Sequence, residues 1–168
     1  MARPARHAFP PAILEVPQEL LAGGTRDAPY EAAAEVAAVP PGSMLRVTRG
    51  DLDVLVAHTS RGLVATDDRC PHMAAPLSLG GLSDCVIGCP LHQGRFDLAT
   101  GATVRFPTTG GLDADGAYHP VWAPPDALPR PEPTDLKAQA RALTRIRRLR
   151  FYPLRIRGGV IEIAFPRP

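Results

Sequence analysis

Two short segments of the sequence carry residue types that bind transition metals. Cys70-Pro71-His72 is followed, after sixteen residues, by Cys89-Pro90-Leu91-His92. Thiolate sulfur and neutral imidazole nitrogen are ligands for both iron and zinc. A cysteine and a histidine separated by one or two residues can reach the same site from one tight loop, and the neighbouring prolines stiffen that loop. We therefore expect two loops that converge on one metal centre, with Cys70, His72, Cys89 and His92 as its ligands.

These loops need a rigid framework, and the sequence predicts mainly β-strands for it. Strands separated by turns about every 8–12 residues indicate an antiparallel sandwich or barrel. Gly158-Gly159 predicts a tight hairpin between the last two strands, because both turn positions need positive φ. The predicted strands are Met44–Val47, Leu52–Ala57, Leu63–Thr66, Phe96–Leu98, Thr103–Phe106, Leu154–Arg157 and Val160–Phe165.

Two segments fall outside this strand pattern. Residues 1–33 are rich in Pro, Ala and Gly and read as an N-terminal extension, so that residues 34–168 form the domain. Within the domain, residues 108–150 read as an insert: a long Gly- and Pro-rich loop, followed by one α-helix over 135–150 that Thr134 caps. We expect Trp122 to anchor the insert to the rest of the domain.

Composition excludes several classes of function. A chain of 168 residues forms one ordinary domain, and 19 basic against 17 acidic residues give a net charge of only +2, which argues against a nucleic-acid partner. No apolar run approaches the roughly 20 residues of a membrane helix, which argues against a membrane role. Three cysteines make no disulfide framework, and the sequence starts without a secretory or twin-arginine signal. We therefore expect a cytoplasmic protein.

The segment from Asp67 to Gly101 resembles Rieske iron–sulfur proteins, which carry C-x-H followed by C-x-x-H. The resemblance covers about residues 34–107 and 151–165. It implies an all-β fold: a Rieske-like antiparallel β-sandwich with a small cluster-binding subdomain, here with an inserted loop and one helix near the C-terminus. It also implies one 2Fe-2S cluster per chain, in which Cys70 and Cys89 bind the inner iron and His72 and His92 bind the outer iron.

Two departures indicate a low-potential, oxygenase-associated subtype. High-potential Rieske proteins have a further pair of cysteines that form a disulfide, where this chain has Ala75 and Leu91. They also supply serine and tyrosine hydroxyls to the cluster, where this chain has Gly94 and Phe96. Fewer hydrogen bonds to the cluster favour the oxidised state, so we expect a potential nearer about −150 mV than +300 mV.

The resemblance implies a one-electron carrier between an NAD(P)H-linked reductase and a terminal ring-hydroxylating oxygenase. Catalytic subunits of such oxygenases hold a further mononuclear iron with two histidines and a carboxylate, whereas His119 is the only histidine after His92. We therefore expect no independent active site. Two alternatives remain: a small subunit of a multi-subunit reductase such as nitrite reductase, and a structural zinc module. Many nitrite reductase small subunits lack the four ligands, and zinc sites usually group like ligands in pairs.

The remaining chemically active side chains have simpler interpretations. Cys85 is expected to be a small buried apolar residue, and Asp67 and Asp68 to support the turn before the first loop. One face of the expected helix is basic and is expected to be exposed to solvent, with docking of a partner as the alternative. Its residues are Lys137, Arg141, Arg145 and Arg148. Three histidines show no partner pattern and are expected to be ordinary surface or loop residues: His7, His58 and His119.

Overall fold

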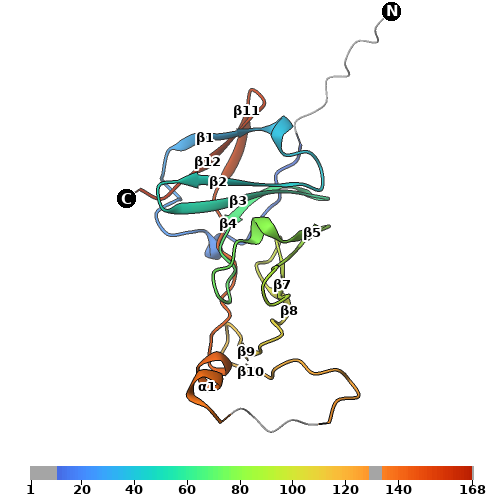
Figure 1. The fold of residues 1–168 in the computed structure, drawn as a ribbon. Helices are drawn as coiled ribbons and strands as arrows, with labels where there is room; N and C mark the ends of the chain where they lie inside the picture. Colours follow the sequence, from blue (N-terminus) through green and yellow to red (C-terminus); the bar gives the residue numbers. More distant parts are fainter. Residues whose placement is uncertain (1–10, 129–133, 168) are drawn as a thin grey trace, which may run out of the picture.

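Antiparallel β-strands make up most of the regular structure in the computed structural model, which describes residues 11–128 and 134–167 (Figure 1). The all-β prediction is therefore confirmed. The strands are β1 Tyr30–Glu35, β2 Met44–Arg49, β3 Leu52–Thr59, β4 Gly62–Asp67, β5 Gly81–Ser83, β6 Val86–Gly88, β7 Arg95–Asp97, β8 Thr103–Arg105, β9 Gly111–Leu112, β10 Tyr118–His119, β11 Leu154–Arg157 and β12 Val160–Ala164. The helices are α1 Leu136–Ala142 and three 3-10 turns, η1 Gln18–Leu20, η2 Val36–Ala38 and η3 Leu77–Leu79.

Two three-stranded antiparallel sheets, β2-β3-β4 and β1-β12-β11, form the sandwich at the top of Figure 1. Their facing side chains form one hydrophobic core, in which Val54 and Val56 of β3 lie with Ile161 and Ile163 of β12, all fully buried. A small sheet of short strands, β5-β6-β7-β8, lies below this sandwich. The second predicted metal-binding segment lies between β6 and β7.

Strand β4 is buried at all six of its positions instead of alternating between a buried and an exposed face. Its second face belongs to a second core, which joins Leu55 and Val64 of the sandwich to Phe96 of β7 and to Phe151. A strand covered on both faces reads as a continuous apolar run. This second core fixes the small sheet, and with it the metal-binding loops, against the sandwich.

The predicted Gly158-Gly159 hairpin is confirmed, and a second hairpin joins two of the other predicted strands. Gly158 and Gly159 have φ values of +57° and +83° and join β11 to β12. Strands β7 and β8 pair around a turn in which Gly101 has a φ of +71°. A Cβ at Gly101 would lie 2.7 Å from Leu20 Cδ1, so the close approach of the N-terminal segment also requires glycine there.

The N-terminal segment packs along the sandwich from residue 11 onward. The backbone N–H of Leu14 donates to the carbonyl of Leu63 at 2.8 Å, and the N–H of Leu63 donates to Ala12 at 2.8 Å. The Leu14 side chain is buried in the second core. Strand β1 pairs with β12 and begins at Tyr30, so the expected boundary before residue 34 falls inside a strand.

The helix of the insert is shorter than predicted, and the bounds 135–150 are wrong. It ends at Ala142, because the chain then pairs with β9: Leu112 N–H donates to Thr144 and Ile146 N–H donates to Leu112. Arg145 and Arg148 therefore lie beyond the helix and cannot share a helical face with Lys137 and Arg141 as predicted. Its N-terminal cap is Asp135, whose Oδ1 accepts the N–H of Ala138 at 2.6 Å, and not Thr134.

Trp122 does not anchor the insert with its side chain, which is 57% exposed. Its backbone N–H donates to the carbonyl of Thr108 at 2.9 Å. In the part of the chain that the structure describes, no helix has the length and apolar character needed to cross a membrane.

Candidate metal centre

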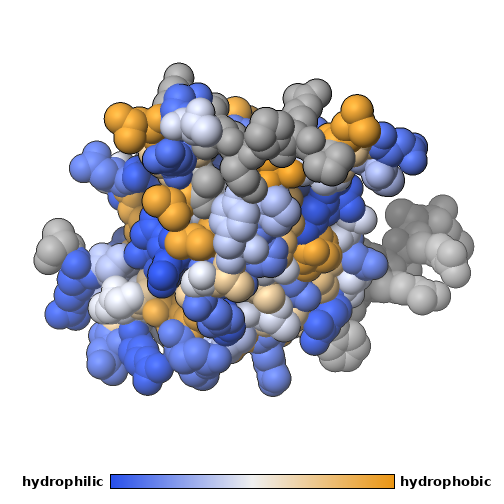
Figure 2. Space-filling view, turned by 90° about the horizontal axis from the view of Figure 1, so that it is seen from below, coloured by the Kyte–Doolittle hydropathy of each residue, from blue (hydrophilic) through white to orange (hydrophobic). Residues whose placement is uncertain are grey.

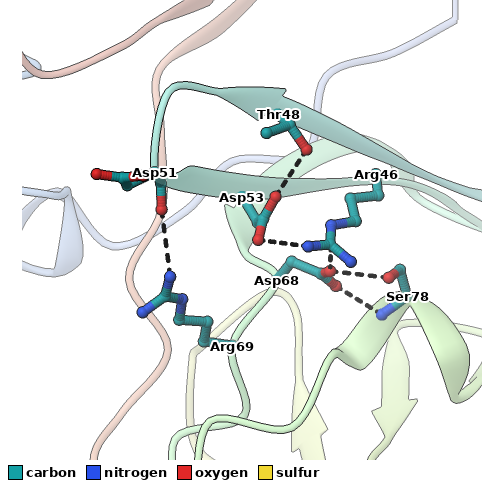
Figure 3. A network of polar contacts seen from close by, with 7 residues as sticks. All are labelled: Arg46, Thr48, Asp51, Asp53, Asp68, Arg69 and Ser78. Atoms are coloured by element: carbon teal, nitrogen blue, oxygen red, sulfur yellow. Dashed lines mark hydrogen bonds and ion pairs between the residues drawn. The ribbon is translucent and has the colours of Figure 1, made fainter.

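A polar network fixes the base of the first loop, which follows β4 (Figure 3). The carboxylate of Asp68 accepts the backbone N–H of Ser78 at 2.6 Å and the hydroxyl of Ser78 at 2.8 Å, so it joins the two ends of the loop. Arg46 on β2 lies 3.4 Å from Asp68 and also binds Asp53 on β3. Asp68 is 1% exposed, and the network therefore ties the loop to the central sheet through a paired, buried charge.

The two loops that carry Cys70 and Cys89 are closed by equivalent backbone hydrogen bonds, a similarity that the sequence does not suggest. Cys70 N–H donates to the carbonyl of Ala75, and Cys89 N–H donates to the carbonyl of Gly94, each at 2.8 Å. Four residues after each cysteine stands a non-glycine residue with positive φ: Ala74 at 56° and Gln93 at 57°. Each loop thus holds its cysteine and histidine in one strained, hydrogen-bonded turn.

The four predicted ligands are brought together as two like pairs. The thiols of Cys70 and Cys89 lie next to each other, and both residues are 5% exposed. The rings of His72 and His92 have centroids 5.0 Å apart and planes at 81°. His72 is 7% exposed and therefore as buried as the cysteines, whereas His92 is half-buried and is the most exposed of the four.

The protonation chemistry of these side chains suits a metal. Burial, with a smaller contribution from the Cys89 thiol, raises the pKa of the Cys70 thiol to about 12. Backbone N–H groups of His72 and Met73 donate to the Cys70 sulfur and act in the opposite direction. Burial, and then the nearby His92 ring, lowers the pKa of His72 and favours its neutral form. Neutral imidazole and thiols that ionise only beside a cation are the states that metal binding uses.

One buried atom lacks a partner that a metal would supply. The Nδ1 atom of His92 is buried and makes no hydrogen bond. An unsatisfied buried polar atom is costly, so a ligand for this nitrogen is expected. The Nε2 atom of His72 is already 3.3 Å from the hydroxyl of Thr109, which leaves Nδ1 of that ring as its free nitrogen. The site therefore fits a metal group held by two sulfurs and by two Nδ1 atoms.

The pairwise arrangement distinguishes two kinds of metal group. Within residues 11–128 and 134–167, no three His, Cys, Asp or Glu side chains converge to hold a single ion. A structural zinc ion needs four ligands around one point. A 2Fe-2S cluster needs two ligands at each of two irons, which matches a cysteine pair beside a histidine pair.

The insert covers this site. The Thr108 N–H donates to the carbonyl of His92 at 2.9 Å, and the Thr109 hydroxyl contacts the ring of His72. On the returning segment, Arg147 N–H donates to the carbonyl of Pro71 at 3.4 Å. Sequence reasoning missed Thr109, because a contact between residues 37 positions apart depends on the path of the insert and leaves no local pattern.

The other singled-out residues lie outside the ligand set. Cys85 is half-buried, with its sulfur 3.9 Å from the hydroxyl of Ser60. His119 has two side-chain partners, contrary to the expectation: its ring stacks on Phe106 at a centroid distance of 3.3 Å, and its Nε2 lies 3.1 Å from Asp113. Asp68 supports the turn through Ser78, whereas Asp67 accepts hydrogen bonds from Arg150 and Tyr152 on the segment that returns from the insert.

The surface at the insert end combines apolar and polar residues. Figure 2, which views this end, shows separate hydrophobic patches among hydrophilic ones. Two exposed apolar residues adjoin the histidines in the sequence: Met73, 48% exposed, and Leu91, 57% exposed. A mixed surface of this kind is typical of interfaces that form and separate repeatedly.

Comparisons with known proteins agree with this geometry. The Rieske [2Fe-2S] domain family matches residues 30–116. The ferredoxin component of the naphthalene 1,2-dioxygenase system of Pseudomonas aeruginosa is 39% identical over 74 residues, which are 44% of this chain and 71% of the relative.

Solved structures share the fold. The ferredoxin of Sphingomonas yanoikuyae B1 has a TM-score of 0.54 and 23% identity, and the alignment covers 82% of this chain and all of the ferredoxin. A chain from the complex of reduced oxygenase and oxidized ferredoxin in carbazole 1,9a-dioxygenase has a TM-score of 0.53 and 21% identity, covering 83% of this chain and 95% of that one. Since the family match spans more than half of the 168 residues, this chain belongs to the Rieske [2Fe-2S] domain family.

Proposed function

We propose that this chain is a one-electron carrier that holds one Rieske 2Fe-2S cluster. Cys70 and Cys89 bind the inner iron, and His72 and His92 bind the outer iron. The observation that carries the proposal is the separation of the ligands into a buried thiol pair and a pair of histidine rings 5.0 Å apart, of which His92 is the more exposed. When bound, the cluster supplies a reversible one-electron couple.

The protein around the ligands keeps their geometry fixed as the charge changes. Backbone N–H groups of His72 and Met73 stabilise negative charge on the Cys70 sulfur. The hydrogen-bonded turns at Ala74 and Gln93 hold the cysteine and the histidine of each loop in a fixed conformation. A rigid site needs little rearrangement on electron transfer, which suits a carrier.

We propose that the electron donor is an NAD(P)H-linked reductase and the acceptor a terminal oxygenase of the ring-hydroxylating type. Support comes from relatives named as ferredoxin components of the naphthalene 1,2-dioxygenase and biphenyl 2,3-dioxygenase systems. The exposed apolar residues Met73 and Leu91, which adjoin His72 and His92 in the sequence, offer a small contact surface for such a partner. The described residues offer no further cluster of three metal-binding side chains for oxygen chemistry.

Two attributions accompany this function. We propose that the Rieske domain begins at Tyr30 with β1, and not at residue 34, and that residues 108–150 form an insert that adds contacts to both ligand loops. We also propose a cytoplasmic location, because none of the three cysteines Cys70, Cys85 and Cys89 is in a disulfide, as is usual in a reducing compartment.

Electron transfer between purified components tests the function. The protein is reduced with one electron equivalent and mixed without oxygen with the oxidised oxygenase component of a naphthalene 1,2-dioxygenase system and, separately, with a sirohaem nitrite reductase. The proposal predicts that electrons reach the oxygenase and that the chain returns to its oxidised spectrum within the mixing experiment. Transfer only to the nitrite reductase would assign the chain to a multi-subunit reductase instead.

A matched pair of variants shows that the transfer uses the proposed ligands. His92→Ala removes a proposed ligand, whereas His58→Ala removes a histidine of the sandwich whose Nδ1 bonds the carbonyl of Val39 at 2.7 Å. We expect His92→Ala to abolish transfer and His58→Ala to preserve it. Equal rates in the two variants would contradict the ligand assignment.

A further inference from the structure

The first residues of the insert contact both histidine ligands but in different ways. Thr108 reaches only the backbone of His92: its N–H donates to the carbonyl at 2.9 Å, and its hydroxyl lies 3.4 Å from the same oxygen. Thr109 reaches the ring of the other histidine, with its hydroxyl 3.3 Å from Nε2 of His72. One side chain of the insert therefore determines how one ligand ring is oriented, and the other does not.

The two histidines consequently have different surroundings. His72 is 7% exposed, and its outer nitrogen is occupied by the Thr109 hydroxyl. His92 is half-buried, with its inner nitrogen buried and without a partner. The insert thus closes over the outer edge of His72 and leaves part of the His92 ring in contact with solvent.

The turn that carries Thr109 is held in place by several contacts. The Gly110 N–H donates to the carbonyl of Pro107 at 2.9 Å, and Gly110 has a φ of +68°. A Cβ at Gly110 would lie 2.4 Å from the carbonyl oxygen of His119, whose ring stacks on Phe106. These contacts place the hydroxyl of Thr109 against His72 with little freedom, which is what a positioning residue needs.

We propose that Thr109 is a positioning residue for His72, and that the insert makes His92 the ligand through which the electron leaves. The inference rests on the proposed function. A neutral imidazole that binds metal with Nδ1 carries its proton on Nε2. The Nε2–H of His72 therefore donates to Thr109 Oγ1, which fixes the ring plane and strengthens its electron donation.

The electron path follows from the coverage of the rings. One electron passes through the His92 ring to the acceptor centre of the partner protein, and no bond forms or breaks. A partner cannot touch the outer edge of His72, because Thr109 and the following turn occupy that position. We therefore expect the partner to contact the His92 side, where Leu91 is exposed.

Substitution of the threonine tests the positioning role. Thr109→Val keeps the shape and removes the acceptor, and Thr109→Ser restores the acceptor. Thr108→Val is the matched control, because that hydroxyl reaches only a backbone carbonyl. Each protein is equilibrated with a redox dye of known potential. We expect Thr109→Val to shift the equilibrium about threefold toward the reduced protein, which corresponds to part of the net free energy of one hydrogen bond. Thr109→Ser and Thr108→Val should match the unchanged protein.

Chemical labelling tests the coverage on the unchanged holoprotein, whether or not any variant folds. Hydroxyl radicals, which oxidise solvent-accessible imidazole rings, are generated briefly in a solution of the oxidised protein, and the oxidised residues are located by mass spectrometry. We expect His92 to be labelled several-fold faster than His72. Equal labelling rates, or an equilibrium unchanged in Thr109→Val, would overturn the inference. Failure of the proposed function looks different, since the unchanged protein would then lack the cluster's spectrum altogether.

Discussion

The hydroxyl of Tyr152 donates to Oδ1 of Asp67 at 2.5 Å and so joins two residues that are 85 positions apart in the sequence. Arg150 donates to the other oxygen of the same carboxylate at 2.7 Å. Asp67 ends β4 and directly precedes the first metal-binding loop, while Tyr152 lies on the segment that returns from the insert. The contact therefore holds the start of the ligand loop and the end of the insert together.

Loss of this hydroxyl should destabilise the fold. Tyr152 is 3% exposed, and Tyr152→Phe leaves one oxygen of a buried carboxylate without its donor. Such a loss costs about 1–3 kcal/mol in the free energy of unfolding. Urea denaturation of the holoprotein measures it. Tyr30→Phe, at a tyrosine that is 36% exposed, serves as the control, and equal stability of the two variants would contradict this account of the contact.

Replacing Gly80, just before β5, with alanine should have a very different effect from replacing Gly81, the first residue of β5. A Cβ at Gly80 would lie 1.8 Å from the carbonyl oxygen of Gly88, the residue before Cys89, whereas a Cβ at Gly81 meets nothing within 4 Å. Overpacking of this kind costs about 1–3 kcal/mol. We expect Gly80→Ala to lower both the melting temperature and the iron content per chain, and Gly81→Ala to change neither. Normal iron content in Gly80→Ala would show that the second loop tolerates displacement of β6.

Asp53 should contribute to stability above its own pKa and lose that contribution in acid. The hydrogen bond from Arg46, and then that from Thr48, lowers the pKa of Asp53 below the usual value of about 3.9. A carboxyl group with a lowered folded-state pKa stabilises the fold above the unfolded-state pKa, and the effect disappears as the pH falls through the folded-state pKa.

Asp53→Asn should therefore be less stable than the unchanged protein at pH 7 and lose less stability on acidification below about pH 4. Unfolding measured from pH 7 to pH 2 gives both curves. Asp51→Asn is the control, because the recorded contact of Asp51 uses its backbone carbonyl. Parallel curves for Asp53→Asn and the unchanged protein would refute the role of the carboxylate.

The reduction potential should lie in the lower part of the Rieske range, nearer about −150 mV than +300 mV. Gly94 lies in the second loop, and Phe96 is fully buried in the following strand, β7. Neither residue offers a hydroxyl to the cluster. Gly94→Ser adds a hydroxyl to the second loop, at the residue whose carbonyl accepts the Cys89 N–H, and should raise the potential, since a hydroxyl donor stabilises added negative charge. Redox titration followed by absorbance checks both values, and a high potential in the unchanged protein would contradict the subtype.

The sequence could predict the elements that local residues determine. The Gly158-Gly159 hairpin and the gathering of Cys70, His72, Cys89 and His92 follow from local turn chemistry and ligand types. The helix was predicted too long, because its periodicity continues past Ala142 while pairing of Thr144 and Ile146 with Leu112 draws the chain into an extended form. The contact of Thr109 with His72 could not be predicted, because it depends on how the insert folds back.

The most direct test of the central claim is electron paramagnetic resonance of the dithionite-reduced protein, with iron, sulfide and zinc measured on the same sample. Cys85→Ser and Cys89→Ser are compared, because only Cys89 belongs to the proposed ligand set. The account predicts a rhombic Rieske signal with two irons per chain in the unchanged protein and in Cys85→Ser, and neither in Cys89→Ser. Stoichiometric zinc without a signal in protein purified without air would contradict it.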